Sequence, residues 1–463
     1  MTHYLLVFVG GLLFSAGLIL LKSPFFAFAL RTTALLNAIL NTSLGEDARQ
    51  KNLIRNLAPL LKSMAIFLLL LIVVIAVAVL PALLHIHLSG TDATAVDTGS
   101  VRFYLSMAAG SVVPFLIPTA KKDSDYSDWS KLLHRMFLDN QHISKALFFI
   151  DRRLNRGKLN TQDESFVVVT GLARAGTTAL TNLLYSTRRF HSLSYANMPF
   201  LLSVNLWRKL YRPRTDALKQ RAHGDRVLFG HSTIEALEEY FFKVFLNDRF
   251  IGENALSEHV IDPETNTYYA DYRKLIGTGA GDTTYIAKNN NLILRHASLS
   301  ELNPGLKTIL IFRNPVDHAF SLLSQHRRFS QLHQSDPFTL EYMDWLGHHE
   351  FGLNHRPFDL GGECLHTGYK PDSIDYWVAI WIEYYAHVLT LGTRENLIPV
   401  NYADLLNSPD ALLTALGERL KTDLHVGGTE AFKKSERPDV GVDAELLRRA
   451  TAIHEQLIVN TVM

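Results

Sequence analysis

Three long apolar runs fill the first quarter of the chain. Residues 4–30 carry no charge apart from Lys22, residues 64–84 carry none, and residues 103–120 form a shorter run with two prolines. A helix of about 20 apolar residues spans a bilayer, so the second run predicts a transmembrane helix most strongly. The third run predicts either a span or a re-entrant or interfacial helix. No Lys or Arg precedes the first run, which disfavours a signal peptide.

Basic residues are unevenly distributed around these runs. Residues 85–101, which follow the second run, include no Lys or Arg. The segment between the first two runs has five basic residues: Arg31, Arg49, Lys51, Arg55 and Lys62. Cytoplasmic segments of membrane proteins carry the excess of Lys and Arg, so we expect this segment in the cytoplasm. Residues 1–120 are thus predicted to form a membrane region with two to three transmembrane helices. With three spans, the chain from about residue 121 onward is cytoplasmic.

Residues 121–162 form a polar linker with helical periodicity. Its apolar side chains fall on one stripe: Trp129, Leu132, Leu133, Met136 and Phe137. An amphipathic helix of this kind either lies at the membrane surface or packs on the domain that follows.

From about residue 163 to residue 463, short β-rich runs alternate with helical ones. Strands are predicted at residues 165–171, 283–289, 306–313 and 397–406, and helices at residues 176–188, 316–329, 376–392 and 408–420. This alternation predicts an α/β domain with a P-loop-like parallel sheet flanked by helices. Residues 329–375 are rich in His, Gly, Asp and Pro, and predict a long irregular insertion.

The composition excludes some functions. Lys plus Arg (46) nearly balances Asp plus Glu (45), so no overall basic field argues for nucleic acid. Any anion site must therefore be built locally. The single cysteine, Cys364, excludes an internal disulfide and suits a reducing compartment.

The first candidate anion site follows the strand at residues 165–171. Its sequence, GLARAGTTAL, has the glycine spacing of a Walker A loop but no lysine after the second glycine. A tight turn before a helix directs free backbone N–H groups toward an anion. The predicted contacts come from the loop and the start of the helix: Gly171, Arg174, Ala175, Gly176, Thr177 and Thr178. Nothing in this loop suits a triphosphate with magnesium.

A second candidate anion site follows the strand at residues 306–313. Arg313 ends the strand, Pro315 suits the first helical turn, and Ser321 lies two turns further on. Two anion sites in one sheet predict a ligand with phosphates at two places, such as a nucleotide with 5′ and 3′ groups.

Together these motifs resemble those of the sulfotransferases that use 3′-phosphoadenosine 5′-phosphosulfate. The first family motif is matched by Arg174 to Thr178, and the second by Arg313, Asn314, Pro315 and Ser321. The resemblance covers about residues 165–460, is closest to the bacterial branch, and implies sulfuryl transfer to a hydroxyl acceptor without a metal. Arg174 stands where many members have lysine, and Ala175 replaces a small polar residue or glycine.

The resemblance also implies roles for individual residues. Arg174, the amides of residues 175–178 and Lys288 would neutralise charge on the bridging oxygen, while Arg313 and Ser321 would hold the 3′-phosphate. The acceptor hydroxyl needs a general base. We expect it at Glu238 or Glu239, with Glu235 and His231 as further candidates; the alternative is that these glutamates are the solvated face of a helix.

Other features leave alternatives open. The segment GHHEFGLNH, residues 347–355, is interpreted as a loop over the acceptor rather than a metal site, because the H-E-x-x-H spacing is missing. Residues Lys433, Lys434 and Arg437 either close over the nucleotide or form solvated surface. Two other functions compete: a kinase or nucleoside triphosphatase with an altered loop, and a membrane protein that only binds nucleotide.

The membrane region points to the acceptor and the location. A domain tethered to a bilayer suits a membrane-borne hydroxyl, on a glycolipid or lipid-linked sugar, better than a soluble metabolite. We expect an integral protein of a bacterial inner membrane, with its catalytic domain in the cytoplasm.

Overall fold

The computed structural model describes most of the chain. The described residues are 2–42, 44–89, 100–116, 127–159, 165–211, 219–220, 228–229, 233–362, 368–392, 396–426 and 441–463. The chain forms two compact units, residues 1–143 and residues 144–463. The boundary between them falls inside the segment predicted to be a linker.

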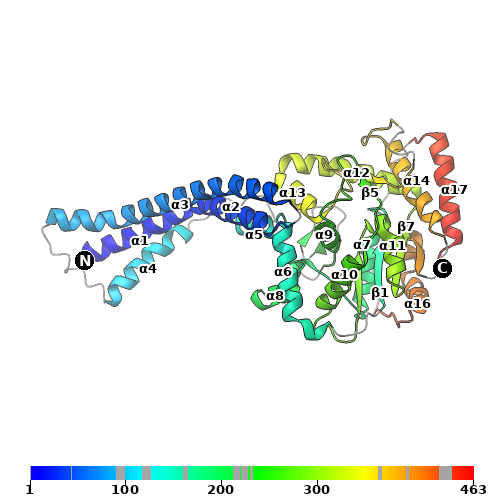
Figure 1. Cartoon of the computed structure of the whole chain (residues 1–463), viewed down its shortest axis with the longest axis horizontal. Coiled ribbons are helices and arrows are strands. Elements are labelled where there is room, and N and C mark those ends of the chain that lie inside the picture. The colour runs from blue at the N-terminus through cyan, green and yellow to red at the C-terminus, as the bar shows by residue number, and fades with distance from the viewer. Residues whose placement is uncertain are drawn as a thin grey trace. The chain divides into compact units, whose positions relative to one another are not determined.

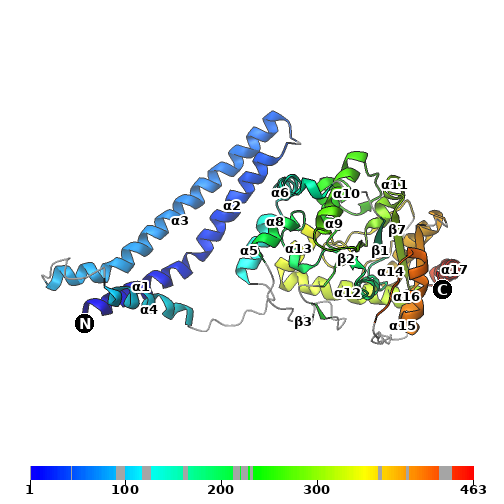
Figure 2. The ribbon, with the colours of Figure 1, turned by 90° about the horizontal axis from the view of Figure 1, so that it is seen from below.

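The first unit is made of helices (Figure 1). They are α1 (Thr2–Leu20), α2 (Lys22–Leu40), α3 (Glu46–Ser89), α4 (Val101–Leu116) and α5 (Asp128–Phe137). Helices α1 and α2 follow one another along α3, and α4 lies beside α1 (Figure 2). The break between α1 and α2 at Leu21 divides the predicted span at residues 4–30. Pro24 explains the break, because it has no N–H to donate to the carbonyl of Leu20.

The basic segment between the first two apolar runs is helical rather than a loop. Residues 22–40 belong to α2, and α3 begins at Glu46, well before its apolar part. At 1.5 Å per residue, the 44 residues of α3 extend for roughly 66 Å, about twice the hydrocarbon thickness of a bilayer. Among the described residues, α2 and α3 are long and apolar enough to cross a membrane, and α1 is a shorter apolar helix. These helices weakly suggest membrane association.

Glycines allow the helices of this unit to approach closely. A Cβ on Gly10 would lie 2.7 Å from the carbonyl oxygen of Ala78 in α3, and one on Gly17 would lie 2.5 Å from Val74. On the other side of α1, a Cβ on Gly11 would lie 2.6 Å from the carbonyl oxygen of Met107 in α4. Small residues at such crossings let helix backbones pack in contact, as in membrane helix bundles.

The second unit is an α/β domain (Figure 1). Its main sheet is parallel, in the order β2 (Phe190–His191), β6 (Thr284–Lys288), β1 (Phe166–Thr170), β7 (Leu306–Phe312), β9 (Leu397–Asn401). Two shorter pairings join β3 (Lys219–Gln220) to β4 (Leu228–Phe229) and β5 (Leu256–Ser257) to β8 (Phe358–Asp359). The predicted parallel sheet flanked by helices is confirmed.

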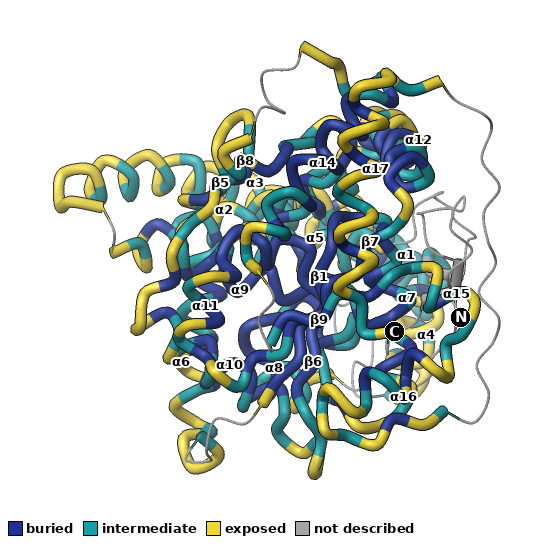
Figure 3. Tube along the Cα trace, turned by 90° about the vertical axis from the view of Figure 1, so that its right-hand side faces the viewer, coloured by how far each residue is buried: buried dark blue, intermediate teal, exposed yellow. Residues whose placement is uncertain are grey.

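Helices cover both faces of the main sheet. Along β7, Ile309 and Ile311 pack into one apolar cluster, while Leu310 and Phe312 pack into another, as the alternation of a strand requires. The first cluster includes residues of α7 (Thr177–Ser186) and α16 (Pro409–Leu420). The second includes residues of α12 (Pro315–Ser335), α14 (Ile374–Thr390) and α17 (Ala444–Val459). Figure 3 shows the strands β1, β6, β7 and β9 as buried backbone inside the domain.

The domain has further helices. They are α6 (Gln141–Leu154), α8 (Val204–Leu210), α9 (Glu239–Phe245), α10 (Pro263–Ile276), α11 (His296–Leu302), α13 (Pro337–Leu346) and α15 (Tyr402–Asn407). Two of them contribute to these clusters: α15 adds Leu405 to the first and α13 adds Met343 to the second. The expectation of an irregular insertion over residues 329–375 is wrong for its first part. Helix α12 continues to Ser335, and α13 follows directly. The predicted core helix at residues 376–392 corresponds to α14.

Candidate functional site

The first anion loop joins β1 to α7 through strained backbone. Gly171 and Gly176 have φ of +149° and +108°, and Arg174 has φ of +71°, in the left-handed region that few residues other than glycine adopt. A Cβ on Gly176 would lie 2.5 Å from the ring of Tyr402. Helix α7 begins at Thr177 with Gly176 as its N-cap, and no side chain caps it. The first amides of α7 thus border the loop.

Three small residues of this loop and of the start of α7 are buried. Ala175 is fully buried, and its methyl group belongs to the apolar cluster between the sheet and α7. A small apolar residue therefore fits this position for packing. Thr177 and Thr178 are buried in the first turn of α7.

The second anion loop joins β7 to α12 and lies next to the first, because β1 and β7 are paired in parallel register. Asn314 caps α12 by accepting hydrogen bonds from the amides of Val316 and Asp317, both at 3.2 Å. The Arg313 guanidinium stacks over the ring of Tyr402, with 5.0 Å to the ring centroid. Burial, reinforced by the charge of Arg174, lowers the pKa of Arg313.

The two loops meet through their side chains. Arg174 Nε donates a hydrogen bond to Ser321 Oγ at 3.3 Å, across 147 residues of sequence. Behind them His318 is fully buried, and its Nε2 lies 2.7 Å from the carbonyl oxygen of Ala173. Burial lowers the pKa of His318 to about 3, so the ring is neutral and donates to that carbonyl. The sequence analysis missed His318, which braces the first loop from the second helix.

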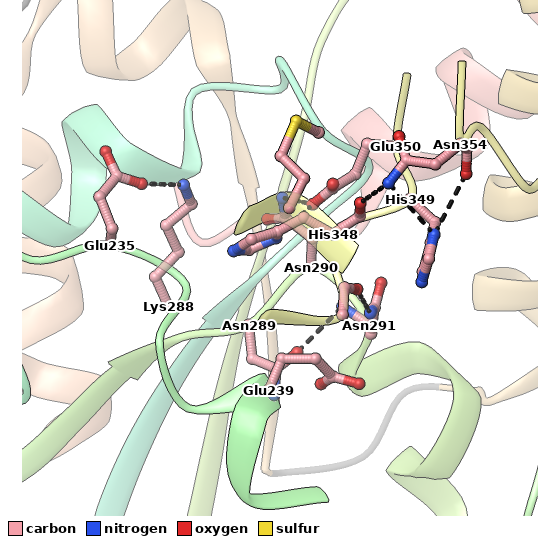
Figure 4. Close-up of polar contacts among 12 residues, drawn as sticks. Glu235, Glu239, Lys288, Asn289, Asn290, Asn291, His348, His349, Glu350 and Asn354 are labelled. Carbon is pink, nitrogen blue, oxygen red and sulfur yellow. Dashed lines mark hydrogen bonds and ion pairs between the residues drawn. The ribbon is translucent and has the colours of Figure 1, made fainter. Parts of the chain in front are cut away.

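Lys288 is the last residue of β6, the strand that pairs with β1 on the side away from β7. It pairs in register with Val169, one residue before the end of β1, so it lies at the same edge of the sheet as the first loop. Its Nζ contacts Glu235 Oε2 at 2.7 Å, and both side chains are about nine-tenths buried. Figure 4 shows this ion pair beside His348, Asn290 and Glu350.

Glu238 and Glu239 are held inside the domain. Glu238 accepts hydrogen bonds from Tyr269, Tyr285 and Asn289, and burial raises its pKa despite these donors. Both oxygens of Glu239 bind the guanidinium of Arg295, at 2.7 and 2.8 Å, and both side chains are almost completely buried. These contacts favour structural roles for the two carboxylates. The third glutamate of this segment, Glu235, forms the ion pair with Lys288.

The loop after α13 contributes a second charged pair. His348 Nδ1 lies 3.2 Å from Glu350 Oε1, and Asn290 Nδ2 donates to the same oxygen at 3.2 Å. Burial lowers the pKa of His348, but the Glu350 carboxylate outweighs burial and the pKa lies above its ordinary value. Burial raises the pKa of Glu350, but the nearby His348 outweighs burial and the pKa falls to about 2. The sequence predicts a loop over the acceptor here but indicates no role for His348 or Glu350.

Some predicted residues lie outside the described ranges. They are His231, Cys364, Lys433, Lys434 and Arg437. Within the described ranges, no three His, Cys, Asp or Glu side chains are grouped to hold a metal ion. His348 and Glu350 form a hydrogen-bonded pair.

The comparison with known families identifies the class of protein. The model of the sulfotransferase family matches residues 167–425, more than half of the chain and all of the elements just described from β1 to β9. The chain belongs to the sulfotransferase family. It is an enzyme of sulfuryl transfer, with an N-terminal helical unit outside the matched region. No curated protein matches it.

Solved sulfotransferases are distant likenesses. One from Mycobacterium tuberculosis is 14% identical, covers 80% of this chain and 90% of its own, and has a TM-score of 0.37. One from Mycobacterium avium is 14% identical, with coverages of 72% and 79% and a TM-score of 0.38. One from Alicyclobacillus acidocaldarius is 15% identical, with coverages of 64% and 94% and a TM-score of 0.31. The family assignment rests on the family match rather than on these scores.

Proposed function

We propose that this sulfotransferase takes its sulfuryl group from 3′-phosphoadenosine 5′-phosphosulfate. The observation that carries the proposal is the meeting of two anion loops at the ends of β1 and β7, joined by the contact of Arg174 with Ser321. The loop from Gly171 to Thr178 would hold the 5′-phosphosulfate on backbone amides and Arg174. Arg313 and Ser321 would hold the 3′-phosphate, a group that a nucleoside triphosphate lacks.

Lys288 would assist departure of the bisphosphate. Its position at the end of β6, beside β1, suits a cation that neutralises charge growing on the bridging oxygen as the sulfur bond breaks. Glu235 holds the ammonium group in place at 2.7 Å. This part of the mechanism depends on fixed charges and on positioning.

Binding of the product nucleotide tests the donor. We expect adenosine 3′,5′-bisphosphate to raise the melting temperature of the full chain in detergent, and ATP with magnesium to raise it less. Arg313→Ala should remove most of the bisphosphate shift, because a charge-assisted contact contributes about 1.5–3 kcal/mol. Arg327→Ala is the matched control, since Arg327 is an exposed arginine on α12 that donates a hydrogen bond to the carbonyl of Asp372. A larger shift with ATP would reject the donor.

We propose a membrane-borne hydroxyl, on a glycolipid or lipid-linked sugar, as the acceptor. The support is the N-terminal unit, whose apolar helices α2 and α3 have the length and composition of membrane spans. Membranes that contain the protein should transfer ³⁵S from the labelled donor into the lipid-extractable fraction. Label confined to the aqueous fraction would instead indicate a soluble acceptor.

The N-terminal helices also support a proposal for where the protein lies in the cell. We propose that the catalytic unit lies in the cytoplasm and that the protein resides in the inner membrane of a bacterium. Five basic residues on α2 and the first half of α3 favour that orientation: Arg31, Arg49, Lys51, Arg55 and Lys62. A reporter that is active only in the periplasm can be fused to the C-terminus. Activity of that fusion would overturn the proposed orientation.

A further inference from the structure

The sulfuryl acceptor must lose a proton, and two neighbouring histidines could accept it. His348 and His349 follow one another in the loop after α13, yet their surroundings differ. His349 lies within 3.5 Å of the Arg356 guanidinium, and burial with that charge lowers its pKa to about 4. His348 instead faces the Glu350 carboxylate at 3.2 Å and retains about one-fifth of its side-chain exposure.

The groups around His348 come from three parts of the chain. Glu350 belongs to the same loop, Lys288 ends β6, and Glu235 lies in the turn before α9. Their charges all act on His348: the carboxylates of Glu350 and Glu235 raise its pKa, and the ammonium of Lys288 lowers it. The ammonium group of Lys288 contacts Oε2 of Glu235 at 2.7 Å, so this carboxylate is held by an ion pair.

We propose that His348, oriented by Glu350, is the general base that takes the proton from the acceptor hydroxyl. Glu350 holds Nδ1, so Nε2 carries the lone pair of the neutral ring. Asn290 holds Glu350 in turn, at 3.2 Å, which fixes the carboxylate from the strand side. Glu350 is thus a positioning residue, and the arrangement is a base held by a third group, as in other activated nucleophile sites. The proposal rests on the proposed donor.

The acceptor oxygen displaces the nucleotide from sulfur in this step. The acceptor oxygen forms a bond to sulfur while the bond from sulfur to the bridging oxygen of the 5′-phosphosulfate breaks. The bonding pair stays on the bridging oxygen, which leaves as part of adenosine 3′,5′-bisphosphate near Lys288. The hydroxyl proton passes to Nε2 of His348, and Glu350 stabilises the imidazolium until the proton returns to water.

The pH dependence of transfer tests this proposal. The full chain in detergent is given ³⁵S-labelled donor, with a membrane lipid extract or water alone as the acceptor. The rate should rise with pH as His348 loses its proton, with a midpoint above 6.5, because the ring must be neutral to accept the acceptor's proton. His348→Asn should lower the rate by about 10²- to 10⁴-fold and remove this ascending limb.

Two further variants separate a catalytic role from a structural one. Glu350→Gln should move the midpoint to lower pH, since it removes the carboxylate that raises the pKa of His348. His349→Asn, the matched control, should keep the midpoint of the native chain. The bisphosphate melting shift shows for each variant that the domain is folded and the donor site intact.

The outcomes separate a wrong base from a wrong donor. Loss of the limb in His348→Asn with a normal bisphosphate shift supports His348 as the base. An unchanged limb in that variant overturns it, as does a native chain that binds the bisphosphate but transfers sulfuryl neither to lipid nor to water. A native chain with no bisphosphate shift rejects the donor itself, and the base assignment falls with it.

Discussion

The turns after β1 and β7 have the same place in the fold but offer an anion different groups. After β1, three residues with positive φ form the turn, and the first amides of α7 have no side-chain cap. After β7, Asn314 occupies the amides of Val316 and Asp317, and Pro315 has no N–H to offer. The first turn therefore presents backbone donors, whereas the second presents the side chains of Arg313 and Ser321.

This difference would match the two ends of the proposed donor. Backbone amides at an uncapped helix start do not change rotamer, so they suit a group whose charge changes during reaction. Side chains on a capped helix suit a phosphate that stays unchanged and serves only to fix the position of the nucleotide. The strain of the first turn is then localised where the chemistry takes place.

Removing the charge of the first turn should have the largest effect. Arg174→Gly is the cleanest change, because glycine adopts a φ of +71° without strain. We expect a loss of roughly 10²- to 10³-fold in the rate of transfer, as for the loss of one donor to a developing charge, and a smaller bisphosphate melting shift, because the 5′-phosphate also loses this contact. Arg188→Gly is the control, since Arg188 is exposed and has a φ of +60°. Equal losses in both variants would contradict the assigned role.

Adding a side chain at Gly176, in the turn after β1, should have the next largest effect. Gly176→Ala forces alanine to a φ of +108° and brings its Cβ to 2.5 Å from the ring of Tyr402. We expect a loss of about 1–3 kcal/mol in the free energy of unfolding, measured by denaturant titration. Gly279→Ala has a similar φ of +82° but open space around the Cβ. A cost no larger than that of the control would show that the turn can relax.

Uncapping the second turn should have the smallest effect. Asn314→Ala removes the acceptor for two amides of α12, and we expect a loss of about 1 kcal/mol in the free energy of unfolding. Asn314→Asp keeps an acceptor and should restore most of that stability. Affinity for adenosine 3′,5′-bisphosphate, measured by calorimetry, should change little in either variant. Affinity gained on uncapping would mean that freed amides also bind the phosphate.

Local signals were enough to predict the sheet and the positions of the turns after β1 and β7, where the anion sites are proposed. The spacing of Gly171 and Gly176, and the Arg-Asn-Pro sequence at residues 313–315, each lie within a few residues of a strand end. Helix α13 carried a local signal too: Pro337 begins it, and Gly347 ends it with a φ of +76°. The abundance of His and Gly around this helix obscures its start and end, and for that reason the composition predicts an irregular segment.

The contacts of the glutamates at the start of α9 and just before it could not be predicted in this way. Glu235, Glu238 and Glu239 lie within five positions, but their partners come from β6, α10 and the region before α11. Helical periodicity indicates only which side chains share a face, whereas these contacts depend on segments about 30 to 60 residues away. His348 and Glu350 lie two residues apart, but the contact of Asn290 with Glu350 depends on a segment 60 residues away in the chain.

The glycines of α1 make the N-terminal unit more than a hydrophobic tether. Gly10 and Gly17 pack against α3, and Gly11 packs against α4, so α1 is fitted to its neighbours on two sides. An unrelated apolar helix of equal length would retain the hydrophobicity but carry side chains where α1 has none. Exchanging α1 for such a helix should therefore break up the bundle even where the chain still reaches a membrane. The unit is a folded module with its own sequence requirements, not an interchangeable anchor.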